Sequence, residues 1–175
     1  MDQHSERKKW ITCFADADCV IFVVSLSCYD EMMTARQTEV NCMVDALALF
    51  EETVSSERLE GMQFILFLNK MDLFAKKILR FPITDCPAFA DFDQFDDPAT
   101  IYSDPRDYEQ TTLYITAKFE AAYKKAVVSR DSRLLTAPSL CTHIICAKDK
   151  NAMEEVLNDI KRSIVSHNQY QQRLF

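Results

Sequence analysis

Three short apolar runs divide this chain, and longer segments of helical periodicity lie between them. The runs cover residues 20–24, 64–68 and 142–146. The middle one reads Phe-Ile-Leu-Phe-Leu without a polar residue, and the last is only partly apolar, since it begins with Thr142 and His143. An unbroken apolar run of this length is typical of a strand buried on both faces of a parallel sheet. The sequence therefore predicts three buried strands.

Apolar residues three or four positions apart predict amphipathic helices over 40–50, 73–79, 115–126 and 151–164. A charged, helix-like segment covers 5–10, and Asn151 with Glu154 resembles a capping box at the start of the last helix. The stretch 81–105 is rich in Pro, Asp, Phe and Ser, which favours a long surface loop. The expected stripe of the first of these helices is Val40, Met43, Val44, Leu47 and Phe50, and that of the last is Met153, Val156, Leu157, Ile160 and Ile164.

Strands that alternate with helices predict an α/β fold in layers, with a mainly parallel sheet and helices on its faces. The length of 175 residues suits a single domain over 1–175. Three clear strands make a small sheet for this class. Such a sheet leaves an open edge unless more chain or a partner covers it.

The composition argues against several classes of function. The net charge of −7, from 20 basic and 27 acidic side chains, argues against a general nucleic-acid binder. Seven Cys without a C-x-x-C pair favour reduced thiols in the cytosol. The longest apolar stretch, Cys19 to Cys28, is too short to span a bilayer, so no transmembrane segment is expected. The single glycine, Gly61, excludes a G-x-x-x-x-G-K-[ST] phosphate loop within this sequence.

The most specific motif is Asn69-Lys70-Met71-Asp72, directly after the middle apolar run. Ligands of open α/β sheets bind beyond the carboxyl ends of the strands, where these side chains are expected. A carboxylate such as Asp72 can accept two N–H bonds from a guanine ring, one from the ring nitrogen and one from the exocyclic amine. The stem of Lys70 can lie along a flat base, and Asn69 can tie neighbouring loops together. The other interpretation of the motif is a polar turn after a buried strand.

Three segments together resemble the alpha subunits of heterotrimeric G proteins. QHSERKKW at 3–10 is similar to the family's second switch segment, LFLNKMDLF at 66–74 to its guanine-specificity loop, and THIICAK at 142–148 to its second guanine-contact loop. The similarity covers nearly the whole chain but only the carboxyl half of the family's Ras-like P-loop GTPase domain. It implies a partial Ras-like fold.

The resemblance also implies roles for individual residues. The implied guanine-binding residues are Asn69, Lys70, Met71, Asp72, Cys146 and Ala147, with the Ala147 backbone N–H on the guanine carbonyl. Gln3 aligns with the catalytic glutamine that orients the attacking water in GTP hydrolysis. The implied partner surface is Arg7, Lys8, Lys9, Trp10 and Phe14, and the implied receptor contacts are Leu174 and Phe175.

The resemblance implies GTP or GDP as cofactor, Mg²⁺ in the family, and a cytoplasmic protein that reaches the inner face of the plasma membrane through its partners. Those partners are a beta-gamma dimer, a G protein-coupled receptor and a downstream effector. The sequence departs from the family at Asp2, Cys28 and Ile145, and it has no counterpart of the phosphate loop, the magnesium ligands or the catalytic arginine. Two functions follow: a guanine-nucleotide signalling switch with GTPase activity, or a truncated, inactive relative that binds partners or receptors.

Overall fold

The computed structural model describes residues 17–35, 38–94, 104–130 and 139–172. Its main sheet has three parallel strands in the order β1-β4-β5, as the three apolar runs predict. The register pairs Val24 with Leu68, and Leu68 with Ile144, so the three strands end close together. The strands of this sheet are β1 (Cys19–Ser25), β4 (Gln63–Asn69) and β5 (Cys141–Ile144).

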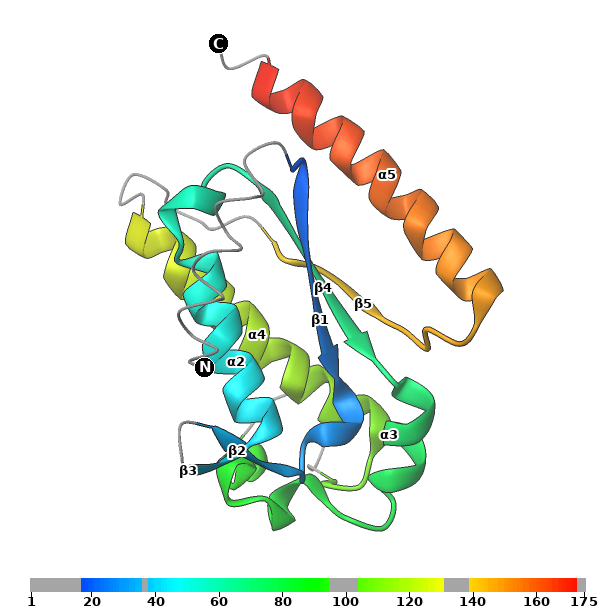
Figure 1. The fold of residues 1–175 in the computed structure, drawn as a ribbon. Coiled ribbons are helices and arrows are strands. Elements are labelled where there is room, and N and C mark those ends of the chain that lie inside the picture. The colour runs from blue at the N-terminus through cyan, green and yellow to red at the C-terminus, as the bar shows by residue number, and fades with distance from the viewer. Residues whose placement is uncertain (1–16, 36–37, 95–103, 131–138, 173–175) are drawn as a thin grey trace.

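Helices cover both faces of this sheet, which gives three layers. Figure 1 shows α2 (Cys42–Val54) and α4 (Tyr108–Arg130) on one side of the strands and α5 (Lys150–Gln172) on the other. A short helix, α3 (Met71–Lys77), follows β4 directly. The arrangement confirms the prediction of a partial Ras-like α/β fold with a parallel sheet flanked by helices.

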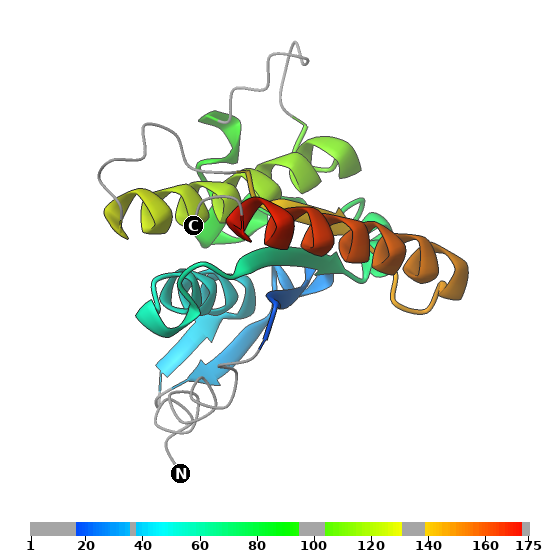
Figure 2. The same cartoon turned by 90° about the horizontal axis from the view of Figure 1, so that it is seen from above.

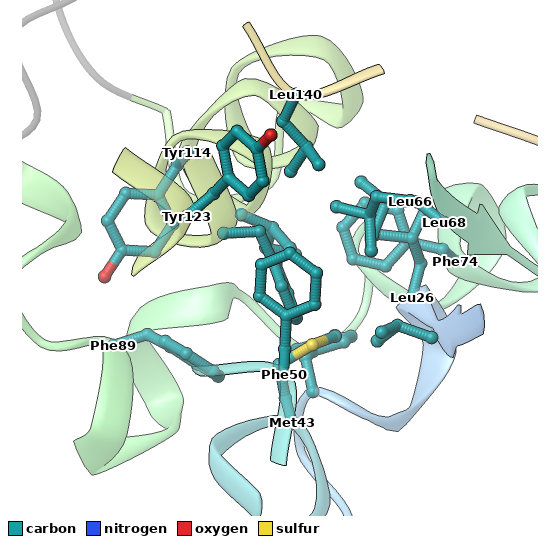
Figure 3. Packing of buried hydrophobic residues seen from close by; sticks show 14 of the residues in the cluster. Leu26, Met43, Phe50, Leu66, Leu68, Phe74, Phe89, Tyr114, Tyr123 and Leu140 are labelled. Carbon is teal, nitrogen blue, oxygen red and sulfur yellow. The ribbon is translucent and has the colours of Figure 1, made fainter. Parts of the chain in front are cut away.

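The larger core lies between β4 and the pair α2 and α4, and Phe50 stands at its centre (Figure 3). The ring of Phe50 is fully buried and makes edge-on contacts with Phe22, Phe64 and Phe119, with centroids 5.1 to 6.5 Å apart. Edge-to-face aromatic pairs at such distances add to the stabilisation from buried area. The apolar positions predicted for the helix around Phe119 are therefore core residues.

The smaller core lies under α5, where Ile160 packs with Ile65, Phe67 and Ile145. It covers β4 and β5 but only the beginning of β1. Ile21 and Val23 point to this same face, opposite Ile65 and Phe67, and remain 42% and 57% exposed. The prediction that strand 20–24 is buried is therefore wrong for one of its faces, because no described helix reaches over that part of β1.

A second, two-stranded sheet was not expected from the sequence. Strands β2 (Met32–Ala35) and β3 (Thr38–Asn41) pair antiparallel, and Figure 2 shows this hairpin beside α2. Val40, predicted to lie in the helix, lies in β3 instead. Val44, predicted on the apolar stripe, is exposed, whereas Met43 and Phe50 are buried.

Asn41 explains where α2 begins. Its side-chain Oδ1 accepts hydrogen bonds from the backbone N–H groups of Met43 and Val44, at 2.9 and 3.1 Å. Its Nδ2 donates to the backbone oxygen of Tyr29 at 2.6 Å and to the Cys86 sulfur at 3.2 Å. One buried amide thus caps a helix and joins it to two other segments.

The expected surface loop over 81–105 is wrong in its first half. Residues 83–94 form three short 3₁₀ helices, η3 (Ile83–Asp85), η4 (Pro87–Phe89) and η5 (Phe92–Gln94). Ile83, Phe89 and Phe92 are buried, and both Phe rings pack edge-on against Tyr114 of α4. The Phe residues that look out of place in a polar loop are its anchors to the core.

The capping box predicted at Asn151 and Glu154 is also wrong. The carboxylate Oδ1 of Asp149 accepts from the backbone N–H groups of Asn151 and Ala152, both at 3.1 Å, so Asp149 caps α5. Of the predicted apolar stripe of this helix, Leu157 is exposed and the other four residues pack in the smaller core. Within the described part of the chain, no helix has the length and apolar character needed to cross a bilayer.

Replacing Asn41 by Ala should lower the free energy of unfolding by about 2–3 kcal/mol, because the helix cap is lost and a buried carbonyl loses its donor. Urea denaturation of the two proteins measures this difference. Asn151→Ala is the matched control, since Asn151 is exposed and Asp149 provides that cap. It should change the free energy by less than about 0.5 kcal/mol. Equal effects of the two substitutions would contradict the role given to Asn41.

Candidate functional site

The carboxyl ends of β4 and β5 meet at one end of the sheet, beside α3 (Figure 1). Asn69 is the last residue of β4, and Met71 and Asp72 form the first turn of α3. Residues 145–148 follow β5 directly. The fold thus brings together the two loops that the sequence singles out, although the 72 residues 73–144 separate them along the chain.

Asn69 connects the two loops through its side chain. Its Oδ1 accepts a hydrogen bond from the backbone N–H of Lys70 at 2.7 Å and another from the backbone N–H of Ala147 at 3.1 Å. The expectation that Asn69 ties neighbouring loops together is confirmed. The same bond occupies the Ala147 N–H, the donor that the resemblance assigns to a guanine carbonyl.

Backbone hydrogen bonds reinforce this connection at Ile145. Its N–H donates to the Leu68 oxygen at 2.8 Å, and its own oxygen accepts from the Met71 N–H at 3.2 Å. The Ile145 side chain is buried under α5. Ile145 therefore holds the start of α3 against the end of β5, a role that its sequence position does not reveal because backbone groups make both bonds.

Lys70 has a left-handed backbone, with φ 62° and ψ 37°, and it precedes the first turn of α3. For a residue other than Gly, this backbone conformation costs roughly 1–2 kcal/mol of free energy. Such backbone strain concentrates at functional sites, where the neighbouring structure holds it in place. Here the neighbours are Asn69 and Met71, each fixed by the hydrogen bonds described above.

Asp72 lies partly exposed on the first turn of α3. Desolvation acts to raise the pKa of its carboxyl group, but a hydrogen bond from Cys146, bonds from backbone N–H groups and the charge of Lys148 outweigh it, so the pKa is lowered. The carboxylate is therefore ionised at neutral pH and able to accept N–H donors. Cys146 and Asp72, predicted to share one site, are brought into contact.

Asp72 offers an acceptor of the kind that a guanine edge requires, and the glycine of the chain lies away from it. Gly61, the one glycine, precedes the amino end of β4, about 20 Å along the strand from Asn69. It cannot contribute to a phosphate loop at this site. In 17–35, 38–94, 104–130 and 139–172, no group of three His, Cys, Asp or Glu side chains could hold a metal ion.

The other predicted site residues lie outside the described residues. These are Gln3, Arg7, Lys8, Lys9, Trp10, Phe14, Leu174 and Phe175. Sequence reasoning missed Lys148 as a contributor to the electrostatics of Asp72. The position of Lys148 directly after Cys146 and Ala147 was the feature of the sequence that could have indicated this contribution.

Replacing Lys70 by Gly should raise the free energy of unfolding by about 0.5–1 kcal/mol, because Gly adopts the left-handed backbone without the steric penalty. Lys148→Gly is the matched control in the neighbouring loop, since Lys148 does not have a positive φ. Its added chain freedom in the unfolded state should lower the free energy by about 0.4–1 kcal/mol. Chemical denaturation measures both, and a decrease for Lys70→Gly would contradict the account of strain.

The match to known proteins covers both loops of the site. The family model for the G-protein alpha subunit matches residues 2–164. Among similar relatives, the guanine nucleotide-binding protein G(o) subunit alpha of Locusta migratoria is 34% identical over 95% of this chain and 40% of its own length. The guanine nucleotide-binding protein alpha-2 subunit of Caenorhabditis briggsae is 34% identical over 99% of this chain and 42% of its own. The chain thus spans about two fifths of the length of these relatives, and it belongs to the G-protein alpha subunit family.

Proposed function

We propose that this chain binds guanine nucleotides through the base and serves as the guanine-reading part of a signalling switch of the G-protein alpha type. The observation that carries the proposal is the Asn69 side chain, which joins the loop of Asp72 to the loop of Ala147. The connection holds Asp72 and Ala147, the two residues proposed to contact the base, at one end of the sheet. The names of the relatives, which are guanine nucleotide-binding proteins, support the same class of ligand.

The Asp72 carboxylate accepts the ring N–H and the exocyclic amine of guanine in this proposal. Its lowered pKa keeps it in the acceptor form at neutral pH. Adenine lacks that pair of donors on one edge, so its binding leaves the carboxylate unpaired, which costs about 10–100-fold in affinity. The Lys70 stem lies along the face of the base. The Ala147 N–H reaches the guanine carbonyl by sharing or leaving its bond to Asn69.

The proposed switch function is based on membership in the G-protein alpha subunit family, and it implies protein partners. We propose that a beta-gamma dimer, a G protein-coupled receptor and a downstream effector are the partners, with Arg7, Lys8, Lys9, Trp10 and Phe14 on one contact surface and Leu174 and Phe175 at the receptor. Gln3 is the proposed catalytic residue for GTP hydrolysis, and Mg²⁺ accompanies the nucleotide in the family. The proposed location is the cytoplasm, at the inner face of the plasma membrane when partners are bound.

Competition against a fluorescent guanine nucleotide tests the proposal on the purified chain. GTP and GMP should displace the probe comparably, because the described residues contact the base and supply no phosphate cradle, whereas ATP should displace it about 10–100-fold more weakly. Asp72→Asn should lose guanine nucleotides and gain xanthosine nucleotides, because the Asn amide donates to the carbonyl that replaces the guanine amine.

Asp93→Asn is the control, since it removes an exposed carboxylate on η5 and should leave binding unchanged. The folded state of each variant is checked by circular dichroism. A folded chain that binds no guanine nucleotide would overturn the proposal, and so would a chain that binds GTP and ATP alike.

A further inference from the structure

A basic and apolar groove lies beside α3. It has a volume of about 390 Å³, is open to solvent, and lies between α3 and the short 3₁₀ helix η1 (Leu26–Cys28). Its apolar part is made by Leu73 and Phe81, which are 43% and 52% exposed. Large apolar side chains exposed next to one another in a hollow mark binding surfaces more often than isolated ones do.

One of the three cations that line the groove is already used in the fold. Lys77 donates to the Ser27 backbone oxygen at 2.8 Å and pairs with Asp30 and Glu31 at 2.5 and 3.1 Å. Burial acts to lower the pKa of Lys77, but the hydrogen bonds to the two carboxylates outweigh it and raise the pKa. Lys77 therefore fastens α3 to η1, and it lines the groove together with its partner Glu31.

The other two cations, Lys76 and Arg80, are exposed on the wall of the groove, four residues apart. Lys76 lies in α3 and Arg80 in the turn after it, and both line the same groove. Within the described residues, no carboxylate forms an ion pair with either of them. On a chain of net charge −7, this leaves a local positive patch beside two exposed apolar side chains.

From this juxtaposition we propose that the groove binds a short acidic peptide segment of another protein, which places one large apolar side chain between Leu73 and Phe81 and carboxylates against Lys76 and Arg80. Charge complementarity selects the acidic segment, and the apolar contact provides the burial that exposed ion pairs alone lack. The proposal is independent of guanine recognition, because Lys76, Arg80 and Phe81 take no part in the bonds of Asn69 or Ala147.

The charges favour a peptide over a membrane surface. Recognition of anionic lipid by folded proteins typically uses clusters of four to eight Lys or Arg, and the groove offers two unpaired cations. An extended anionic surface would also meet the remaining acidic surface of the chain, whose net charge is −7. A short peptide segment contacts only the groove and not the acidic surface around it.

Fluorescence polarisation with a labelled peptide, in which one Phe lies among four Glu, tests the proposal on the full chain. The Lys76→Glu, Arg80→Glu double variant should weaken binding at least about tenfold, because two attractions become repulsions. Phe81→Ala should weaken the Phe-containing peptide but not the same peptide with Ala in place of Phe. Added salt should weaken binding by the wild-type chain.

Lys161→Glu, Lys124→Glu is the matched control, with the same change of charge at exposed positions of α5 and α4. It should bind the peptide as the wild type does, and circular dichroism should show that both double variants fold.

Equal binding by the two double variants, or equal binding of a peptide with Gln in place of Glu, would overturn the proposal. Binding to vesicles of anionic lipid without binding of the peptide would overturn it in favour of a membrane surface. Self-association that the groove variant abolishes would overturn it in favour of a second copy of this chain.

Discussion

The burial of β4 on both faces, with a paired neighbour along each edge, is the constraint on which the rest of the structure depends. Its residues 64–68 are all buried, with Phe64, Leu66 and Leu68 in the larger core and Ile65 and Phe67 in the smaller one. Burial of five large apolar side chains contributes roughly 1.5–3 kcal/mol each before entropy is counted. The strand is therefore fixed in register, and the residue after it, Asn69, leaves the sheet at a defined point.

Because β4 ends at this fixed point, the loops after β4 and β5 are held together at the candidate site. The side chain of Asn69 reaches the Ala147 amide, Ile145 bonds to both Leu68 and Met71, and Lys70 is held in a strained left-handed conformation between them. Asp72 follows with a lowered pKa on the first turn of α3. The guanine recognition that we propose is thus a property of how β4 and β5 end. The groove between α3 and η1 uses the same helix for a different surface.

Most of the sheet could be predicted from the sequence, because an apolar run such as 64–68 leaves few alternatives to a buried strand. The contact between the loops after β4 and β5 could also be predicted, because parallel strands end at the same edge of a sheet. The failures share a physical cause, which is tertiary contact that local pattern does not record. Val40 belongs to β3 because Asn41 is bonded to Tyr29 and Cys86, and Phe89 is buried because Tyr114 lies opposite it. Ile21 and Val23 are exposed because α5 covers only the neighbouring strands, and the role of Ile145 rests on its backbone, which no side-chain pattern reports.

Amide hydrogen exchange of Ala147, followed by NMR, tests most directly whether the Asn69 side chain joins the two loops of the site. In the wild-type chain the Ala147 amide should exchange slowly relative to an unbonded loop amide, because it donates to Asn69. In Asn69→Ala it should exchange about 5–10-fold faster, as the loss of one hydrogen bond of about 1 kcal/mol requires, while the amides in the middle of β4 keep their protection. An Ala147 amide that exchanges equally fast in both proteins would contradict the account.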